Sequence, residues 1–147
     1  MPTFNQLVKQ GRKSVAKKSS TKQYAKNVLK YVNKERKKAG LKPLKLDTKL
    51  CQAANGRAKE IKKKFSHTRP NGKKCFSILK EYGLSPRAMG ENIAAGQTSA
   101  KQVVKAWMNS KGHRENILSK DFKKMGIGKF KKADSKYKVY WAQLFSS

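Results

Sequence analysis

Apolar residues recur at helical spacing in the first half of the chain and predict two amphipathic helices. The first runs from Thr21 toward a stop at Gly40. The second begins behind Asp47, whose side chain can cap a helix N-terminus. The apolar stripes consist of Tyr24, Val28, Leu29 and Val32 in the first helix and Leu50, Ala54, Ala58 and Ile61 in the second. Small residues at positions 53, 54 and 58 predict that the second helix packs closely against a neighbour.

The second half of the chain predicts two shorter helices and three strands. The third helix covers residues 74–82. The fourth begins at a capping box formed by Ser99 and Gln102 and ends at Gly112, where a loop follows. Short apolar segments predict strands at 89–95, 124–131 and 136–145. The last of them is largely apolar on both faces from Val139 to Phe145, as in a strand covered by helices on each side. Helices grouped around a few antiparallel strands define an α+β fold.

Positive charge distinguishes this chain from an ordinary domain of its size. Its 147 residues suit one domain and include 37 Lys+Arg against 8 Asp+Glu, for a net charge of +29. Such a surface attracts polyanions, so we expect an anionic polymer or surface among its partners. Against nucleic acid as the partner, aromatic residues are not interleaved with the basic ones as a base-stacking platform needs. We expect no transmembrane segment, because no apolar run approaches the roughly 18 residues needed to cross a bilayer, and no signal peptide follows Met1.

The first 20 residues differ in character from the rest. Residues 1–20 contain no acidic side chain and few apolar ones, which predicts a basic, disordered arm in front of a domain over residues 21–147. The arm resembles the extreme N-terminus of the small-subunit ribosomal protein that lines the decoding centre. The resemblance stops by about Ser20 and no later residue continues it, so we assign the arm no ribosomal role.

The cysteines and histidines supply the candidate chemistry. Cys51 and Cys75 permit one disulfide, and a bridge and two buried thiols both remain open. The only two histidines, His67 and His113, lie on either side of Glu91 in the sequence. Two imidazoles and one carboxylate are the ligands of a catalytic zinc with an open fourth position, and the same groups can act as a general acid and base. No motif supports a serine or cysteine nucleophile.

Three motifs around Glu91 and His113 resemble the signature of a known family. Gly90-Glu91-Asn92-Ile93-Ala94 is followed by A-W-M-N-S at 106–110 and by G-H-R-E-N-I-L at 112–118. Together they resemble the CAP superfamily of cysteine-rich secretory, antigen 5 and pathogenesis-related proteins, in its small bacterial secreted form. The resemblance runs from about Tyr24 to the C-terminus. It implies a three-layer α-β-α sandwich with a small antiparallel sheet, and an extracellular or cell-envelope location.

The resemblance also implies a site. In the family, the residues that correspond to His67, Glu91 and His113 converge in one cleft, and animal and plant members usually add a second glutamate at the position of Ser110. With serine there, the resemblance implies that zinc, if bound, is held weakly by His67 and His113, with Glu91 as an additional candidate ligand. No cofactor is expected to be required.

Several functions fit these residues. We favour a monomeric, non-enzymatic binding domain whose cleft, formed by His67, Glu91, Ser110 and His113, takes a small molecule, lipid, metal ion or envelope polymer. A hydrolase would instead use Glu91 with the two histidines as catalytic groups. A non-specific binder of polyanions, nucleic acid included, would use the basic arm and the lysine-rich surface. A purely structural role is also open, in which Glu91 and the histidines hydrogen-bond across the junction of sheet and helices.

Overall fold

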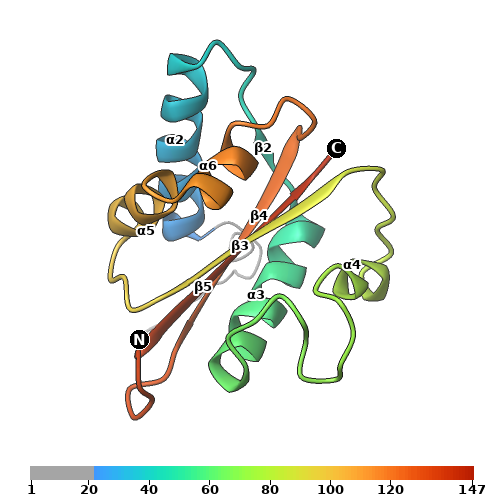
Figure 1. Ribbon diagram of the computed structural model, residues 1–147, viewed down its shortest axis with the longest axis vertical. Coiled ribbons are helices and arrows are strands. Elements are labelled where there is room, and N and C mark those ends of the chain that lie inside the picture. Colours follow the sequence, from blue (N-terminus) through green and yellow to red (C-terminus); the bar gives the residue numbers. More distant parts are fainter. Residues whose placement is uncertain (1–21) are drawn as a thin grey trace, which may run out of the picture.

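Residues 22–147, the part of the chain that the computed structural model describes, form three layers (Figure 1). The middle layer is a sheet with the strand order β2 (Lys45–Leu46), β4 (Lys124–Lys131), β5 (Val139–Ser146) and β3 (Met89–Ala95). One face is covered by α2 (Gln23–Lys38), α5 (Ala100–Met108) and α6 (Lys111–Ile117), and the other by α3 (Thr48–Lys63) and α4 (Ser77–Glu81). The α+β sandwich expected from the sequence is confirmed. The predicted arm over residues 1–20 lies outside the described residues.

The strands agree closely with the sequence pattern. Strands β3 and β4 have the predicted bounds, and all eight residues of β5 are buried between the helical layers. β5 begins at Val139 instead of residue 136, because Lys138 adopts a left-handed conformation with φ of 67° in the turn before it. Both β3 and β4 pair antiparallel with β5. The sheet is not purely antiparallel, however: β2 pairs parallel with β4 and, with only two residues, is too short for periodicity to predict.

The helix boundaries required two corrections. The predicted helix at 74–82 is confined to α4, and Cys75 precedes it with its backbone N–H bonded to the carbonyl of His67. The predicted end at Gly112 is wrong, because α5 ends at Met108 and Gly112 lies inside α6, where a loop was expected. Gly112 lacks the positive φ of a helix-ending glycine, whereas Gly40 has it. The chain breaks instead at Ser110, which is extended.

The close packing predicted for the second helix is confirmed at two glycines of β4. A Cβ on Gly126 would lie 2.2 Å from the carbonyl carbon of Leu50, and one on Gly128 would lie 2.3 Å from the carbonyl oxygen of Ala54. The backbones of α3 and β4 are therefore in direct contact, with no room for a side chain between them. This contact fixes α3, and with it the loop after α3 that carries His67.

The interior contains two hydrogen-bonded tryptophans and two free cysteines. The indoles of Trp107 and Trp141 are buried and donate hydrogen bonds to the carbonyls of Ile93 and Gln97 at 3.1 and 2.9 Å. Cys51 and Cys75 are both buried and unbridged.

Between residues 22 and 147, no helix has the length and apolar character needed to cross a membrane.

Candidate functional site

Glu91 is held in the interior by an arginine that the sequence analysis did not single out. Arg57 reaches from α3 to β3, donating from Nε to Oε2 of Glu91 at 2.6 Å and from Nη2 to Oε1 at 3.0 Å. Neither side chain is more than 1% exposed. Both carboxylate oxygens are therefore occupied by a bidentate guanidinium, the strongest common form of buried charge pairing.

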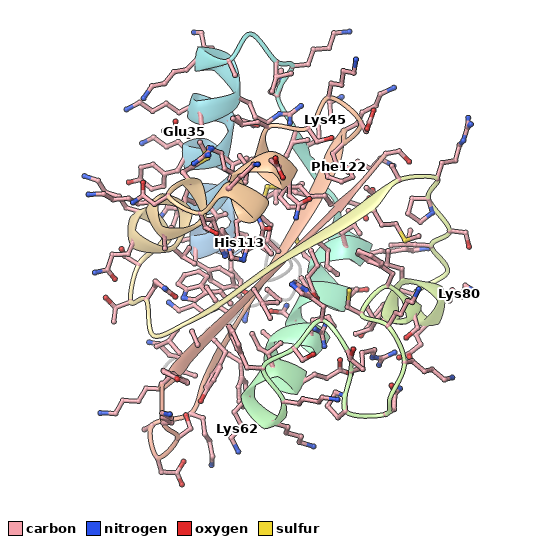
Figure 2. The ribbon with its side chains drawn as sticks, viewed as in Figure 1. Glu35, Lys45, Lys62, Lys80, His113 and Phe122 are labelled. Atoms are coloured by element: carbon pink, nitrogen blue, oxygen red, sulfur yellow. The ribbon has the colours of Figure 1, made fainter. Side chains whose placement is uncertain are left out.

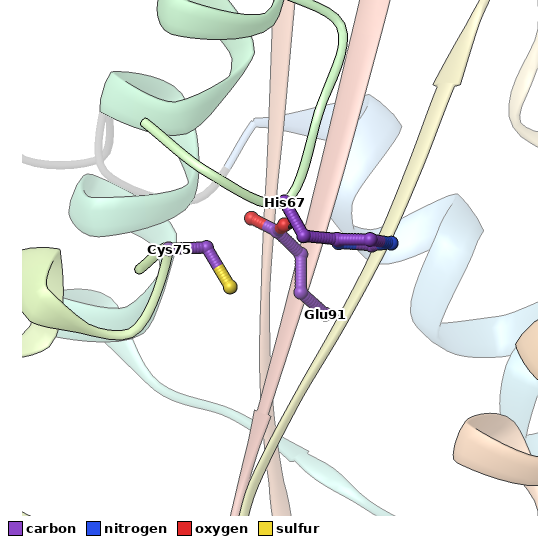
Figure 3. A group of neighbouring side chains, drawn as sticks. All are labelled: His67, Cys75 and Glu91. Carbon is purple, nitrogen blue, oxygen red and sulfur yellow. Dashed lines mark hydrogen bonds and ion pairs between the residues drawn. The ribbon is translucent and has the colours of Figure 1, made fainter. Parts of the chain in front are cut away.

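His67 completes this network from the loop after α3. Its Nδ1 lies 2.8 Å from Oε1 of Glu91 (Figure 3), while Arg57 also donates from Nη2 to the carbonyl of Ser66 at 2.7 Å and so fixes the loop. Burial opposes ionisation of Glu91, but the hydrogen bonds and charges of His67 and Arg57 outweigh it and lower the pKa of the carboxyl group. An ionised carboxylate only accepts, so Nδ1 of His67 carries the proton, and Nε2 is the ring nitrogen not engaged by Glu91.

The two histidines have opposite electrostatic surroundings. The hydrogen bond to Glu91, only partly opposed by burial, raises the pKa of His67. Burial, followed by the charge of His67, lowers the pKa of His113. The buried Nδ1 of His113 has no hydrogen-bond partner among residues 22–147. Near neutral pH, His113 is therefore a neutral imidazole, the form that binds metals and accepts hydrogen bonds.

A cavity of about 490 Å³ brings these histidines together with Ser110. Its remaining lining is largely apolar, with Phe65, Ile93, Ala106 and Trp107 among its walls. Glu91 is not among the lining residues and contacts His67 from the protein interior. We call this cavity the cleft. The structure thus places His67, Ser110 and His113 on the cleft and Glu91 behind His67.

Two asparagines from the sequence motifs attach α6 to β3. Asn116 donates from Nδ2 to the carbonyl of Glu91 at 3.2 Å and to Oδ1 of Asn92 at 2.9 Å. Asn92 in turn donates to the carbonyl of His113 at 3.2 Å. These bonds position α6, which carries His113, so the asparagines act on the site through the backbone.

Sequence reasoning missed Arg57, and it considered Cys75 only as half of a possible disulfide, not as a neighbour of Glu91. Arg57 could have been noticed, because it falls on the buried stripe of the second predicted helix, where an arginine needs an acidic partner. Ligand atoms of His67, Cys75 and Glu91 lie within 4.8 Å of one another. Burial, with the charge of Glu91 adding to it, raises the pKa of the Cys75 thiol to about 12, so this sulfur stays protonated and is a poor metal ligand.

The fold and motifs agree with the comparisons to known proteins. A family model described as the cysteine-rich secretory protein family, CAP, matches residues 29–145. The chain belongs to this family. It is 45% identical over 112 residues to the protein YkwD of Bacillus subtilis, covering 75% of this chain and 44% of YkwD. It is 31% identical over 134 residues to human Golgi-associated plant pathogenesis-related protein 1, covering 80% of this chain and 79% of the human protein.

Solved structures show the same fold. One is an extracellular protein containing an SCP domain from Bacillus anthracis, with a TM-score of 0.73 and 27% identity over 84% of this chain and 40% of that one. Another is an outer surface protein from Borrelia burgdorferi, with a TM-score of 0.74 and 27% identity over 83% of this chain and 90% of that one. The chain spans less than half the length of the two Bacillus proteins.

Proposed function

We propose that this chain is an extracellular CAP-type binding domain whose cleft holds a small, mainly apolar molecule with at least one polar group. The observation that carries the proposal is the cleft itself, with two imidazoles, two serines and one glutamine among otherwise apolar walls. Its volume of about 490 Å³ falls within the range of small-molecule sites. The imidazoles of His67 and His113 line the cleft and are its candidate polar contacts, and Nε2 of His67 is not engaged by Glu91.

The extracellular location draws on the similar proteins. The Bacillus anthracis structure is described as an extracellular protein and the Borrelia structure as an outer surface protein. The net charge of +29 suits a protein that works beside an anionic envelope.

Binding is favoured over hydrolysis because of the state of Glu91. Its two oxygens accept three hydrogen bonds from Arg57 and His67, and its side chain is 1% exposed. A general base must reach the proton that it removes, and Glu91 does not line the cleft. In a hydrolase, His67 would have to be the base and Glu91 the group that orients it.

Filling the cleft should block binding of an apolar probe. We expect Ala106→Phe to weaken binding of the neutral fluorophore N-phenyl-1-naphthylamine by about tenfold or more, because the new ring occupies the space the probe needs. The measurement is a fluorescence titration. Ala133→Phe, in the exposed turn between β4 and β5, is the matched control and should leave the affinity unchanged. Equal binding by all three proteins would contradict a ligand site in the cleft.

Zinc is a second candidate ligand, suggested by the two imidazoles on one cleft. The available donors do not fit a tight site. A catalytic zinc takes three protein ligands, but Glu91 is engaged by Arg57, and Ser110 stands where a carboxylate would be needed. Any zinc held by His67 and His113 is therefore expected to be weakly bound.

Restoring the missing carboxylate should strengthen zinc binding. We expect Ser110→Glu to tighten zinc binding by at least about tenfold, since even an outer-shell partner changes metal affinity by about 10- to 100-fold.

Zinc binding by the wild-type protein should weaken as the pH falls from about 7.5 to about 5.5. The raised pKa of His67 makes this imidazole gain a proton first as the pH falls, while His113, with its lowered pKa, stays neutral longer. Titration calorimetry at both pH values, with His113→Ala for comparison, tests this. Equal affinities for wild type, Ser110→Glu and His113→Ala would exclude the cleft as the zinc site.

A further inference from the structure

A second hollow lies away from the cleft and has a different chemistry. It measures about 660 Å³ and shares no lining residue with the cleft. Five lysines line it, and no acidic residue does; they are Lys42, Lys45, Lys120, Lys123 and Lys124. We call it the basic groove. Figure 2 shows two of its residues, Lys45 and Phe122, beside each other near one end of the sheet.

The basic groove is built around a buried arginine. Arg36 is 2% exposed, and its guanidinium donates to three carbonyls, those of Lys42, Ile117 and Ser119, each at 2.8 Å. These bonds hold the loop after α2 and the loop after α6, which form two walls of the groove. Unlike Arg57, Arg36 has no carboxylate partner among residues 22–147. Its charge therefore adds to that of the lysines without being neutralised by an ion pair.

The lysines are held close together by the sheet. Lys45 and Lys124 are register partners in the parallel pair of β2 and β4, and the backbone N–H of Lys45 bonds to the carbonyl of Lys123 at 3.0 Å. Like charges placed opposite each other on neighbouring strands destabilise the sheet. A bound anion would reduce this repulsion, so the repulsion between the lysines favours anion binding.

The apolar residues of the basic groove bear on which class of polyanion it can bind. Phe122 is 7% exposed and stacks on Phe145 with ring centroids 5.2 Å apart, so it offers an apolar edge but no open face for a nucleic-acid base. Among the described residues, the exposed large apolar side chains are Phe65, Met89 and Tyr137, and none of them lines the groove, so the groove lacks the apolar anchors with which a protein surface inserts into a bilayer. Lysine is a compact point charge that binds phosphate without the planar pairing that arginine uses for carboxylates.

We propose that the basic groove binds a linear polyol-phosphate chain. The lysines contact successive phosphates, and the carbon backbone of the polymer lies along Pro43 and Phe122. This site is independent of the cleft and would place the domain on a phosphate-bearing polymer while the cleft remains open to its own ligand.

Two triple variants of the whole chain separate a local site from the general positive field. The groove variant carries Lys42→Gln, Lys45→Gln and Lys124→Gln. The control carries Lys62→Gln, Lys80→Gln and Lys101→Gln. All six lysines are exposed and form no ion pair within residues 22–147, and Figure 2 shows Lys62 and Lys80 well away from Lys45. Each variant loses three positive charges, and residues 1–21 are identical in both, so their contribution to binding cancels.

The probe is poly(glycerol phosphate), with affinity measured by calorimetry over a range of salt concentrations. We expect the groove variant to bind about tenfold or more weakly, with a shallower salt dependence, and the control to change by less than about twofold. Oligothymidylate with the same number of phosphates should bind wild type more weakly than the polymer does. An equal loss in both variants would overturn the proposal in favour of a delocalised charge effect. Tighter groove-dependent binding of oligothymidylate or of phosphatidylglycerol vesicles would overturn the choice of polymer.

Discussion

Replacing Arg57 with methionine should destabilise the domain by about 3–5 kcal/mol, the usual cost of leaving one partner of a buried ion pair alone. The variant removes both hydrogen bonds to the buried carboxylate of Glu91 and leaves His67 as its remaining side-chain partner. Glu60 also loses a bond from Arg57 but keeps those from Arg69. The measurement is the free energy of unfolding in urea at neutral pH.

Two further variants define what the result means. Arg87→Met, at an exposed arginine, should change the stability by no more than about 0.5 kcal/mol. The double variant Arg57→Met/Glu91→Met should recover most of the loss, because replacing a whole buried pair by apolar residues is often neutral or better. A loss below about 1 kcal/mol for Arg57→Met alone would show that Glu91 does not depend on this arginine.

Adding a single methyl group at Gly126 should destabilise the domain by about 3 kcal/mol, at the upper end for overpacking. The new Cβ would lie 2.2 Å from the carbonyl carbon of Leu50, and backbone cannot move aside as a flexible side chain can. Relief would require α3 to shift away from β4, which also moves the loop that carries His67. Thermal unfolding followed by circular dichroism measures the effect.

Gly112→Ala is the matched control for this prediction. A Cβ at Gly112 meets no atom within 4 Å, and the residue is helical, so alanine should stabilise α6 by up to about 1 kcal/mol. If Gly126→Ala and Gly112→Ala had the same effect, the contact between α3 and β4 would be looser than the structure shows.

The elements predicted correctly are those whose burial repeats along the sequence. The stripe from Leu50 to Ile61 and the largely apolar, fully buried β5 each repeat a pattern over several residues, and the structure confirms both. The elements that the sequence analysis did not predict are short, or their prediction depended on a single residue. β2 has two residues, and α6 was hidden because Gly112 was interpreted as a helix end when its backbone is helical.

The candidate site, too, could be predicted only in part. The motifs around Glu91 and His113 singled out residues that the fold brings near His67, although nothing in their separation along the chain shows that they meet. Neither the pairing of Arg57 with Glu91 nor the resulting exclusion of Glu91 from the cleft could be predicted. Both depend on how α3 lies on the sheet, which is set by the contact between its backbone and two glycines of β4.

The order of the strands has a consequence for how the domain is made. β5 follows every other described element in the sequence, yet it lies between β3 and β4 and pairs with both. Until residues 139–146 emerge from the ribosome, β3 and β4 have no partner in common, and the two helical layers have no complete sheet to cover. The sheet of this domain therefore cannot be completed before β5 has been synthesised, so the domain closes in one late step rather than element by element.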